Sequence, residues 1–387
     1  MVFPPIFRVI LLSVLAHTAY KGSKVLMTLS ALELGANDFY VGLLFSMFAI
    51  FPLLLSVYAG KISDRIGFRW PMILGASGLV FGLYIPYLRF SLPLLYISAA
   101  LIGFCYIFYT VAVQHLIGAM AEGIERTKNF SWYSLGIGMT ALLGPTSAGF
   151  LIDATSHRTT FFILSVLPTI PVLLMLFFRG WLPIAEGISV AKTDQSKQSV
   201  GDLLKNNSLR RALITAGIIE TGLELYNLLL PIYGHKIGLS PSQIGMILGA
   251  FGMALLLVRS AMTNLVKLYC EERVLAISLF SAVIVCIIFP FVKSFWPLAL
   301  ISFVLGLGLG CGSPLSMMLA YNRAPTARAG EAMGLRQMVT KGTEVLVPFV
   351  FGSLSAGLGM VPVFWLDAFL LGIAACIMHF DANRRPK

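Results

Sequence analysis

Twelve stretches of about 20 predominantly apolar residues follow one another along this chain of 387 residues. A helix needs roughly 20 apolar residues to cross a bilayer, and lipid admits only spanning helices or closed barrels. The sequence therefore predicts an all-α membrane protein with twelve transmembrane helices. The predicted spans are about 7–29, 40–59, 70–89, 94–116, 130–152, 159–178, 210–233, 242–262, 273–292, 297–320, 331–355 and 361–380.

Composition excludes a water-soluble globule. Hydrophobic residues make up 58% of the chain and charged residues 12%, and the mean hydropathy is +0.87. Too little polar surface is available to coat a soluble fold of this size. The chain is expected to lie in lipid.

Positive charge predicts the orientation, because cytoplasmic loops retain Lys and Arg. With both termini in the cytoplasm, the inner loops and the C-terminal tail hold fifteen Lys and Arg residues and the outer loops hold three. The same bias accounts for most of the net charge of +11, so contact with membrane lipids explains it and no nucleic-acid partner is needed.

The sequence contains no residue pattern typical of an enzyme, a metal site or a cofactor site. Its five cysteines and five histidines are dispersed, without disulfide or metal-ligand spacing. A glycine-rich run, 306–312, lies within a span and does not match the dinucleotide-binding pattern, so close helix packing or a flexible gate explains it better. With no nucleophile–base or phosphate-binding arrangement, we expect no enzyme, no cofactor and no metal.

Two halves of the chain repeat each other at an offset of 203 residues. The stretch Gly35–Gly42 (GANDFYVG) aligns with Gly238–Gly245 (GLSPSQIG). The longest polar stretch between them, 179–209, is rich in Lys, Ser, Gln and Asp. The repeat predicts a six-helix bundle over 1–178, a cytoplasmic linker over 179–209 and a second six-helix bundle over 210–387.

The same register aligns polar side chains in the first and seventh spans. Each set is spaced i, i+4, i+7 and occupies one helical face. Charged groups within a bilayer are costly, so they are candidates for a functional site. The aligned residues are His17 with Glu220, Lys21 with Glu224, and Lys24 with Asn227.

The eleventh span carries a third polar face that the fifth span lacks. Gln337, Lys341 and Glu344 are again spaced i, i+4, i+7, and Lys341 and Glu344 replace Gly138 and Ala141 of the first half. At ~1.5 Å rise per residue both charged groups lie near the middle of the membrane. Transporters place substrate and ion sites at that level.

The loop after the second span resembles the signature loop of the major facilitator superfamily. Its residues read GKISDRIGFR, from Gly60 to Arg69. The resemblance covers twelve spans, the repeat and the central linker. It implies that this loop closes the cytoplasmic side. The matching residues are Gly60, Asp64, Arg65, Gly67 and Arg69.

The fifth span resembles the GPxxG motif of the antiporter branches of that superfamily. Glycines let helices approach and a proline bends the span. Against this, a family arginine in the fourth span is replaced by Ala99, so any proton-linked arginine lies elsewhere or the coupling differs. The motif residues are Gly136, Gly138, Gly144, Pro145 and Gly149.

Several of these groups also have structural explanations. Lys341 and Glu344 are equally well explained as an internal ion pair. Lys24 is better explained by a side chain that reaches the headgroups than by a binding role. Arg89, Arg259 and Arg336 lie near span ends and are expected to anchor there.

The resemblance implies that the first, fourth, seventh and tenth spans line a central cavity. Glu220 is then the leading proton carrier, Lys21 with Glu224 the leading pair between halves, and Glu344 with Lys341 the next coupling site. Tyr106, Tyr109, Thr110, Gln114 and His115 would contribute to the substrate wall, for which ordinary packing is an equal alternative.

The favoured function is proton-coupled efflux of a small organic, amphiphilic or zwitterionic solute, by a protein expected to be a monomer in a bacterial inner membrane. Two alternatives stay open. One is proton-linked uptake of a small organic anion, and the other is a lipid translocase or a non-transporting sensor.

Overall fold

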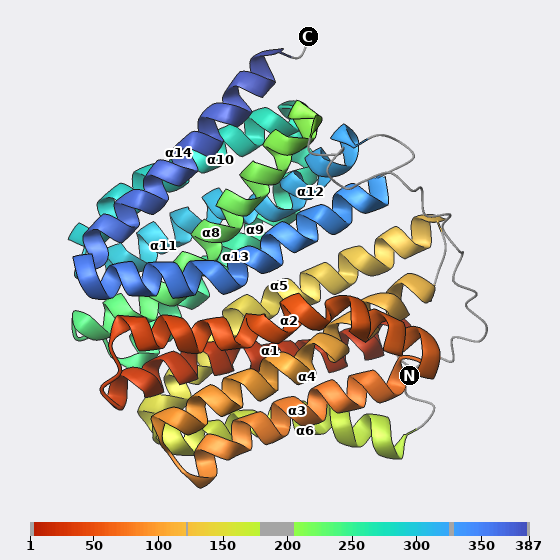
Figure 1. Cartoon of the computed structure of the whole chain (residues 1–387), viewed down its shortest axis with the longest axis vertical. Coiled ribbons are helices and arrows are strands. Elements are labelled where there is room, and N and C mark those ends of the chain that lie inside the picture. The colour runs from red at the N-terminus through yellow and green to blue at the C-terminus, as the bar shows by residue number, and fades with distance from the viewer. Residues whose placement is uncertain (1–3, 121–122, 179–204, 325–328, 385–387) are drawn as a thin grey trace. The chain divides into compact units, whose positions relative to one another are not determined.

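A computed structural model describes residues 4–120, 123–178, 205–324 and 329–384, and Figure 1 shows its helices. These residues form α-helices and one short 3-10 turn, with no strand in the four described ranges. The helices of the first half are α1 (Pro5–Glu33), α2 (Asp38–Ile66), α3 (Arg69–Leu88), α4 (Leu92–Ala119), α5 (Gly123–Ala154) and α6 (His157–Phe177). Those of the second half are α8 (Asn207–Lys236), α9 (Pro241–Leu268), α10 (Glu271–Ile288) with the turn η2 (Phe289–Phe291), α11 (Phe295–Gly310), α12 (Gly312–Arg323), α13 (Ala329–Leu358) and α14 (Met360–Arg384).

Ten of the described helical stretches are long and apolar enough to cross a membrane. The stretch Phe295–Arg323 counts as one span although it contains two helices, α11 and α12. The helices α1 and α13 have 29 and 30 residues but fall outside the ten. Ionisable side chains within them lower their mean hydropathy. The all-α membrane fold is confirmed, and a total of twelve spans is compatible with it.

The described residues fall into two compact units by their contacts. The first unit comprises Met1–Lys192 together with Gly234–Gly249, and the second comprises Thr193–Tyr233 together with Ala250–Lys387. The end of α8 and the start of α9 thus belong to the first unit. The predicted division into 1–178, 179–209 and 210–387 stays a prediction, and most of that linker, 179–204, lies outside the described residues.

The first unit is built by close packing among its six helices. The helix α4 packs on α2 and α3, α1 packs on α5 and α6, and α3 packs on α6. Its core joins α1, α3 and α4, with Leu12, Met72 and Tyr109 all fully buried. Burial of each large apolar side chain contributes about 1.5–3 kcal/mol in water, but in lipid the tight packing itself holds the helices together.

The second unit contains a span made of two successive helices and a buried charge cluster. Cys311 separates α11 from α12 and keeps α-helical backbone angles, with a φ of −74° and a ψ of −19°. At one end of the unit, Arg323 pairs with Glu272 at 3.2 Å and with Asp381 at 2.8 Å. Arg211 pairs with the same Asp381 at 2.8 Å. Two positive and two negative groups therefore compensate one another where α8, α10, α12 and α14 meet.

The two loops that carry the repeat adopt the same conformation. Gly35 and Gly238 both have a φ of 80°. Behind them, the N–H of Ala36 donates to the carbonyl of Ala31 and the N–H of Leu239 donates to that of Gly234, both at 2.9 Å. This is a Schellman motif, in which a glycine at positive φ ends the helix. The 203-residue offset read from the sequence is therefore present in the backbone.

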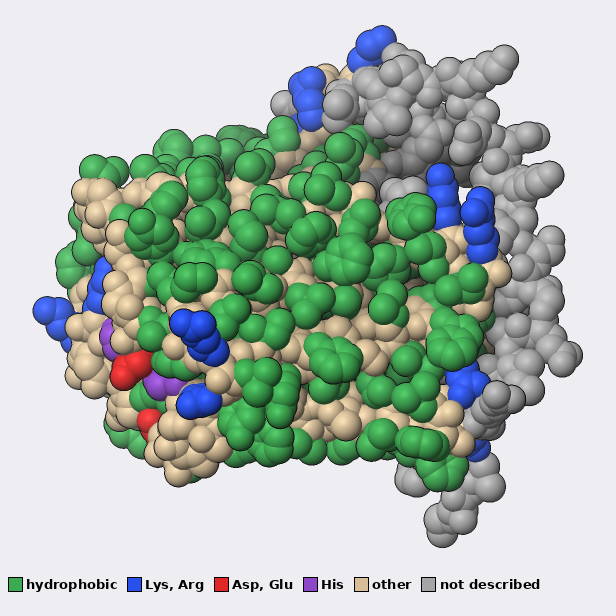
Figure 2. Space-filling view, turned by 60° about the horizontal axis from the view of Figure 1, so that its bottom comes forward, with side chains coloured by type: hydrophobic (Ala, Val, Ile, Leu, Met, Phe, Trp, Pro, Cys, Tyr) green, Lys and Arg blue, Asp and Glu red, His purple; other side chains and the backbone are tan. Residues whose placement is uncertain are grey.

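Apolar side chains cover the surface of the spans, as Figure 2 shows for one face. Leu54, Phe177 and Trp296 are 71%, 75% and 79% exposed. A water-soluble protein rarely presents such a continuous apolar surface. These faces are suited to lipid.

The left-handed glycine at the repeated loop should be sensitive to β-branched substitution. Gly238→Val places a Cβ-branched side chain at a positive φ, which should cost roughly 1–2 kcal/mol. The midpoint of thermal unfolding in detergent should fall. Gly238→Asn is the matched control, because Asn tolerates this conformation, and it should stay close to the parent. Equal midpoints for both variants would contradict the assignment.

Candidate functional site

The polar face of α1 begins with a buried histidine in an aromatic setting. The Nδ1 atom of His17 lies 2.9 Å from the carbonyl oxygen of Ser13. The ring centroids of Tyr106, Tyr109 and Tyr133 lie 5.2, 6.2 and 6.3 Å from the His17 ring. His17 is 7% exposed. The sequence indicated His17 and the α4 tyrosines separately, and the structure brings them together.

A stack of tyrosines extends this cluster along α1 and α4. Tyr20 stacks on Tyr106 with centroids 3.9 Å apart, and Tyr106 stacks in turn on Tyr109 at 6.1 Å. The buried hydroxyl of Tyr106 has no hydrogen-bond partner in the described part of the chain. Buried polar groups are normally hydrogen-bonded. The hydroxyl of Tyr109 likewise has no partner there, so the stack combines an aromatic surface with two unused hydroxyls.

The lysines of α1 differ in exposure. Lys21 is half-buried. Lys24 is 8% exposed, and its Nζ lies 4.4 Å from the ring centroid of Phe45. The expectation that Lys24 reaches the headgroups is wrong, because its ammonium group interacts with the aromatic face of Phe45 instead.

The other residues expected in the cavity wall differ in their contacts and exposure. On α4, Thr110 donates to the carbonyl of Tyr106 at 3.2 Å, and Gln114 is exposed. His115 packs edge-on against Phe68. On α8, Asn227 donates to the carbonyl of Leu223 at 2.8 Å.

The acidic face of α8 lies in the second unit. Glu224 is 6% exposed and Glu220 is half-buried. Glu220 interacts electrostatically with Arg259 of α9 and with Arg336 of α13. The sequence suggested that its partner would come from the first span, and it missed both arginines. The pairing of Lys21 with Glu224 stays a prediction of the repeat symmetry.

Arg336 is not a headgroup anchor. It is 6% exposed, and its guanidinium donates to the carbonyl and hydroxyl oxygens of Ser313 at 3.0 and 3.1 Å and to the hydroxyl of Ser316 at 3.2 Å. Burial of a guanidinium is tolerated only with such partners. The expectation of an anchor is therefore wrong for Arg336.

Lys341 and Glu344 form an ion pair within α13. Both side chains are part-buried, with 26% and 16% of their areas exposed. This is the internal pair that the sequence gave as one of two alternatives. Glu220 differs from this pair, because the arginines with which it interacts lie on other helices of its unit.

The residues of the signature loop connect α2, α3 and α6. Gly67 ends α2 with a φ of 79°. Arg69 then donates to the carbonyls of Met175 and Leu176, the closest contact being 2.5 Å, and so occupies the C-terminal end of α6. Arg65 is exposed and Gly60 half-buried, and the side chain of Asp64 lies outside the described residues. The role of this loop as a gate stays a prediction.

The glycines of the fifth span lie where backbones meet. A Cβ on Gly144 would lie 2.9 Å from the carbonyl oxygen of Thr18 and 2.8 Å from the amide of Gly22 in α1. A Cβ on Gly149 would collide with the carbonyl of Pro241 and lie 3.1 Å from the Cα of Gly245. These glycines therefore allow α5 to touch α1 and the start of α9.

The remaining motif residues have lesser contacts. A Cβ on Gly136 would lie 2.8 Å from the side chain of Ile10, and Gly138 is buried. Pro145 lies inside α5, and its carbonyl would be 2.7 Å from a Cβ on Gly245.

Polar contacts hold the segment Gly234–Gly249 on the rest of the first unit. Lys236 pairs with Asp38 at 2.6 Å. A carboxylate oxygen of Asp153 accepts the backbone N–H of Ser242 at 2.8 Å, and the hydroxyl of Thr146 donates to the carbonyl of Gly245 at 3.2 Å. The first unit thus includes the α8–α9 connection as a packed element, which the sequence alone did not indicate.

A small cavity lies behind this segment. It has a volume of about 140 Å³ and is lined by Leu29, Glu33, His157, His235, Leu239, Pro241 and Ile244. That volume accommodates a few water molecules and is too small for an organic solute, since ligand pockets usually measure about 300–1,000 Å³.

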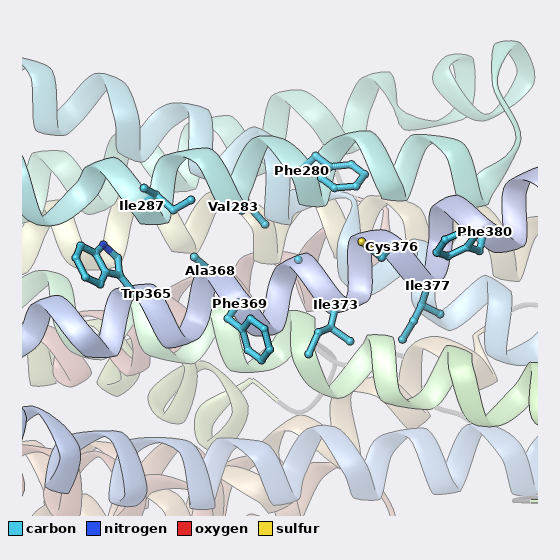
Figure 3. Close-up of a pocket in the computed structure, with 11 residues that line it drawn as sticks. Phe280, Val283, Ile287, Trp365, Ala368, Phe369, Ile373, Cys376, Ile377 and Phe380 are labelled. Carbon is cyan, nitrogen blue, oxygen red and sulfur yellow. The ribbon is translucent and has the colours of Figure 1, made fainter.

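A larger groove lies between α10 and α14 of the second unit, shown in Figure 3. Its volume is about 710 Å³, and aromatic and aliphatic side chains such as Phe280, Ile287 and Trp365 line it. None of the lining side chains is acidic or basic. The groove is suited to an acyl chain and lacks the groups needed to orient a polar solute.

Sequence reasoning also missed a buried carboxyl group on α14. Asp367 of α14 is 4% exposed, and the thiol of Cys286 lies 3.7 Å from its Oδ2. A single Asp in the last span had no spacing pattern to distinguish it, and only the packing of α10 on α14 places the thiol next to it.

An all-helical membrane fold with ionisable groups inside its spans is typical of a membrane transport protein. The family model of the Major Facilitator Superfamily matches residues 9–233 and 212–387. The chain belongs to the Major Facilitator Superfamily.

Curated relatives carry the name multidrug resistance protein MdtG. Those of Salmonella paratyphi B (strain ATCC BAA-1250 / SPB7) and Salmonella newport (strain SL254) are each 27% identical over 345 residues, which is 86% of this chain and 83% of the relative. The similarity therefore extends over most of both proteins.

Solved transporters share the fold. A crystal structure of a POT family transporter in complex with 5-aminolevulinic acid matches with a TM-score of 0.81 at 14% identity, covering 99% of this chain and 96% of that one. The nucleoside transporter NupG matches with a TM-score of 0.74 at 16% identity, covering 99% and 100%. These identities establish the fold alone.

The close contact between α1 and α5 predicts that Gly144→Ala is destabilising. The added methyl group overlaps the backbone of α1, and overpacking of this kind costs typically about 1–3 kcal/mol. The midpoint of thermal unfolding in detergent should fall. Gly357→Ala is the matched control, since nothing lies within 4 Å of the added methyl group there. If the two variants unfold at the same temperature, the contact is not as tight as described.

Proposed function

We propose that this protein is a secondary active transporter that works by alternating access and exchanges protons for a small organic solute. The favoured direction is efflux, and the favoured solute is amphiphilic or zwitterionic. The family supports transport, and the relatives named as multidrug resistance proteins support efflux.

The observation that carries proton coupling is the position of Glu220. It lies on the polar face of a membrane-spanning helix and interacts with two arginines from different helices. Loss of the Glu220 charge would leave those two arginines without its compensation. Protonation of Glu220 therefore changes the interactions of α8, α9 and α13 together.

The aromatic cluster of the first unit supports an organic solute. Stacked tyrosine faces provide apolar contact area, and the unused hydroxyl of Tyr106 provides one polar anchor. Along the sequence, the polar faces of the first and seventh spans carry positive charge on Lys21 and Lys24 and negative charge on Glu220 and Glu224. This mixture matches a zwitterion or an amphiphile better than a neutral sugar.

Two other functions remain as alternatives. The lysines of α1 and the arginines near Glu220 also suit proton-linked uptake of a small organic anion. The apolar groove between α10 and α14 would suit a lipid translocase. A counterflow assay in proteoliposomes with organic cations, anions, zwitterions and a labelled lipid separates these functions.

Glu220→Gln should uncouple transport from the proton gradient. The amide is permanently neutral and mimics the protonated carboxyl. Uphill transport driven by an imposed pH gradient should fall to background in proteoliposomes, while downhill exchange of the solute identified in the counterflow assay continues. The binding affinity of that solute should also lose its pH dependence between about pH 5.5 and 9.

Glu220→Asp is the matched control, because it keeps the carboxyl group and shortens the side chain by one methylene. It should retain part of the gradient-driven transport and the pH dependence. Full gradient-driven transport and a parental pH profile in Glu220→Gln would remove Glu220 as the carrier. Glu344 would then be the next candidate.

A further inference from the structure

The groove between α10 and α14 is built from one face of each helix. On α14 its lining residues recur every three or four positions from Trp365 to Phe380, and on α10 Phe280, Val283 and Ile287 do the same (Figure 3). From Trp365 to Phe380 the groove is about 22 Å long, at ~1.5 Å rise per residue. It therefore follows most of a hydrocarbon core that is roughly 30 Å thick.

Two aromatic contacts show how the ends of the groove are paired. The ring centroids of Phe280 and His379 lie 6.5 Å apart, and those of Phe291 and Trp365 lie 6.3 Å apart. The helices α10 and α14 are therefore antiparallel, with the start of α10 beside the end of α14. Tryptophan is enriched at the membrane–water interface, so Trp365 indicates one membrane surface and the start of α10 the other.

The first turn of α10 places an arginine in line with the groove. Arg273 precedes Phe280 by seven residues and Ile287 by fourteen, so the three residues occupy one face of the helix. Arg273 is exposed. A positively charged side chain therefore follows the apolar lining at the end where α14 finishes.

The acidic side chains at this end of the unit are engaged with other helices. Glu271 accepts a hydrogen bond from Asn322 of α12 at 3.3 Å, and Glu272 and Asp381 both pair with Arg323 of α12. These carboxylates are therefore bound on the side of α12, whereas Arg273 lies on the face of α10 that continues the groove.

The sequence adds positive charge at the same end. After Phe380 the chain contains Arg384, Arg385 and Lys387, and Asp381 is its single acidic residue. Arg385 and Lys387 lie outside the described residues. Basic residues next to a membrane-spanning helix favour anionic lipid headgroups. An apolar groove with positive charge at one end is complementary to a lipid with an anionic headgroup.

We propose that the groove between α10 and α14 is a binding site for an anionic phospholipid, whose phosphate binds Arg273 and whose acyl chain lies along Phe280 and Cys376. The lipid comes from the leaflet at the end of α14, which the distribution of Lys and Arg predicts to be the cytoplasmic one. The lipid stays bound, unlike the substrate of a translocase. The site is independent of Glu220 and of proton coupling.

The dimensions of the groove fit a chain from one leaflet. One leaflet holds half of the hydrocarbon thickness, roughly 15 Å, which corresponds to about ten residues of helix. An acyl chain that starts level with Arg273 therefore passes Phe280 and ends near Val283, within the groove. A guanidinium can bind a phosphate through two parallel hydrogen bonds. Arg273 thus supplies the preference for an anionic headgroup, and the groove supplies apolar contact area.

Quenching of tryptophan fluorescence by brominated lipids measures which lipid occupies the groove. The five native tryptophans are replaced by phenylalanine, and Phe280→Trp introduces one reporter into the groove of the full-length chain. The protein is reconstituted into mixtures of phosphatidylglycerol and phosphatidylcholine in which one of the two lipids carries bromine on its acyl chains. The dependence of quenching on composition gives the affinity of the anionic lipid relative to the zwitterionic lipid.

The groove reporter should show an affinity for phosphatidylglycerol about fivefold above that for phosphatidylcholine, the size expected for one basic residue near an anionic headgroup. Arg273→Gln should abolish this preference, and Arg273→Lys should keep most of it because the charge remains. Arg210→Gln is the matched control, since Arg210 is an exposed arginine of α8 that does not line the groove. It should leave the preference unchanged.

A reporter on another lipid-facing surface tests whether the preference is local. Leu346 of α13 is 61% exposed, and a protein with Leu346→Trp as its single tryptophan should show no preference between the two lipids. The site would be overturned by equal preference at both reporters, by an equal fall in Arg273→Gln and Arg210→Gln, or by no preference at the groove reporter.

Filling the groove gives a second test. A Cβ on Gly372 would lie 3.9 Å from the side chain of Val283, so the backbone accepts a side chain there and Gly372→Phe should place its ring in the groove. Added phosphatidylglycerol should raise the midpoint of thermal unfolding of the parent in detergent more than phosphatidylcholine does, because a ligand of the folded state stabilises it. Gly372→Phe should lose this difference. An unchanged difference would place the lipid elsewhere and overturn the site.

The quenching and unfolding assays need no solute and no gradient, so failure of the lipid site is distinct from failure of the proposed function. The counterflow assay with a labelled lipid adds one further outcome. Protein-dependent flux of phosphatidylglycerol that falls in Arg273→Gln would make the groove a transport path and overturn its role as a site for a resident lipid.

Discussion

No water is available in the hydrocarbon core of a bilayer, so each charged group there needs a partner within the protein or a path to water. The contacts between helices in this structure depend on how these charged groups find their partners. Glu220 interacts with two arginines, Arg336 uses two serines, and Lys24 lies over an aromatic ring. Each interaction joins two helices, so the same contacts that make the charges tolerable also hold those helices together.

Glycine makes these contacts possible at the level of the backbone. Gly144 brings α1 and α5 together, and Gly310 and Gly312 let α9 and α8 approach Cys311. Without a hydrophobic driving force between helices in lipid, such close packing supplies much of the stability. Around Cys311, close packing of this kind occurs together with hydrogen bonds from Arg259 to Gly310 and from Arg336 to Ser313 and Ser316.

Periodicity was sufficient to predict the helices and the repeat, because apolar spans and the paired loops around Gly35 and Gly238 are local patterns. It also indicated the polar faces of α1, α8 and α13. It could not find the partners of Glu220, since Arg259 and Arg336 come from other helices and lie near predicted span ends. Burial of Arg336 depends on α12, which hydropathy does not separate from α11. The sequence also could not show that the ammonium group of Lys24 lies over the ring of Phe45 and not at the lipid headgroups, because Phe45 comes from another helix.

Infrared difference spectroscopy tests the central claim most directly, which is that Glu220 changes its protonation within the working range of the protein. The carbonyl stretch of a protonated carboxyl group is recorded as the pH of detergent-solubilised protein is lowered from about 9 to 5.5 and compared between the parent and Glu220→Gln. The account predicts a band that appears in the parent over this range and is missing from the variant. Identical titration spectra for the two proteins would contradict it.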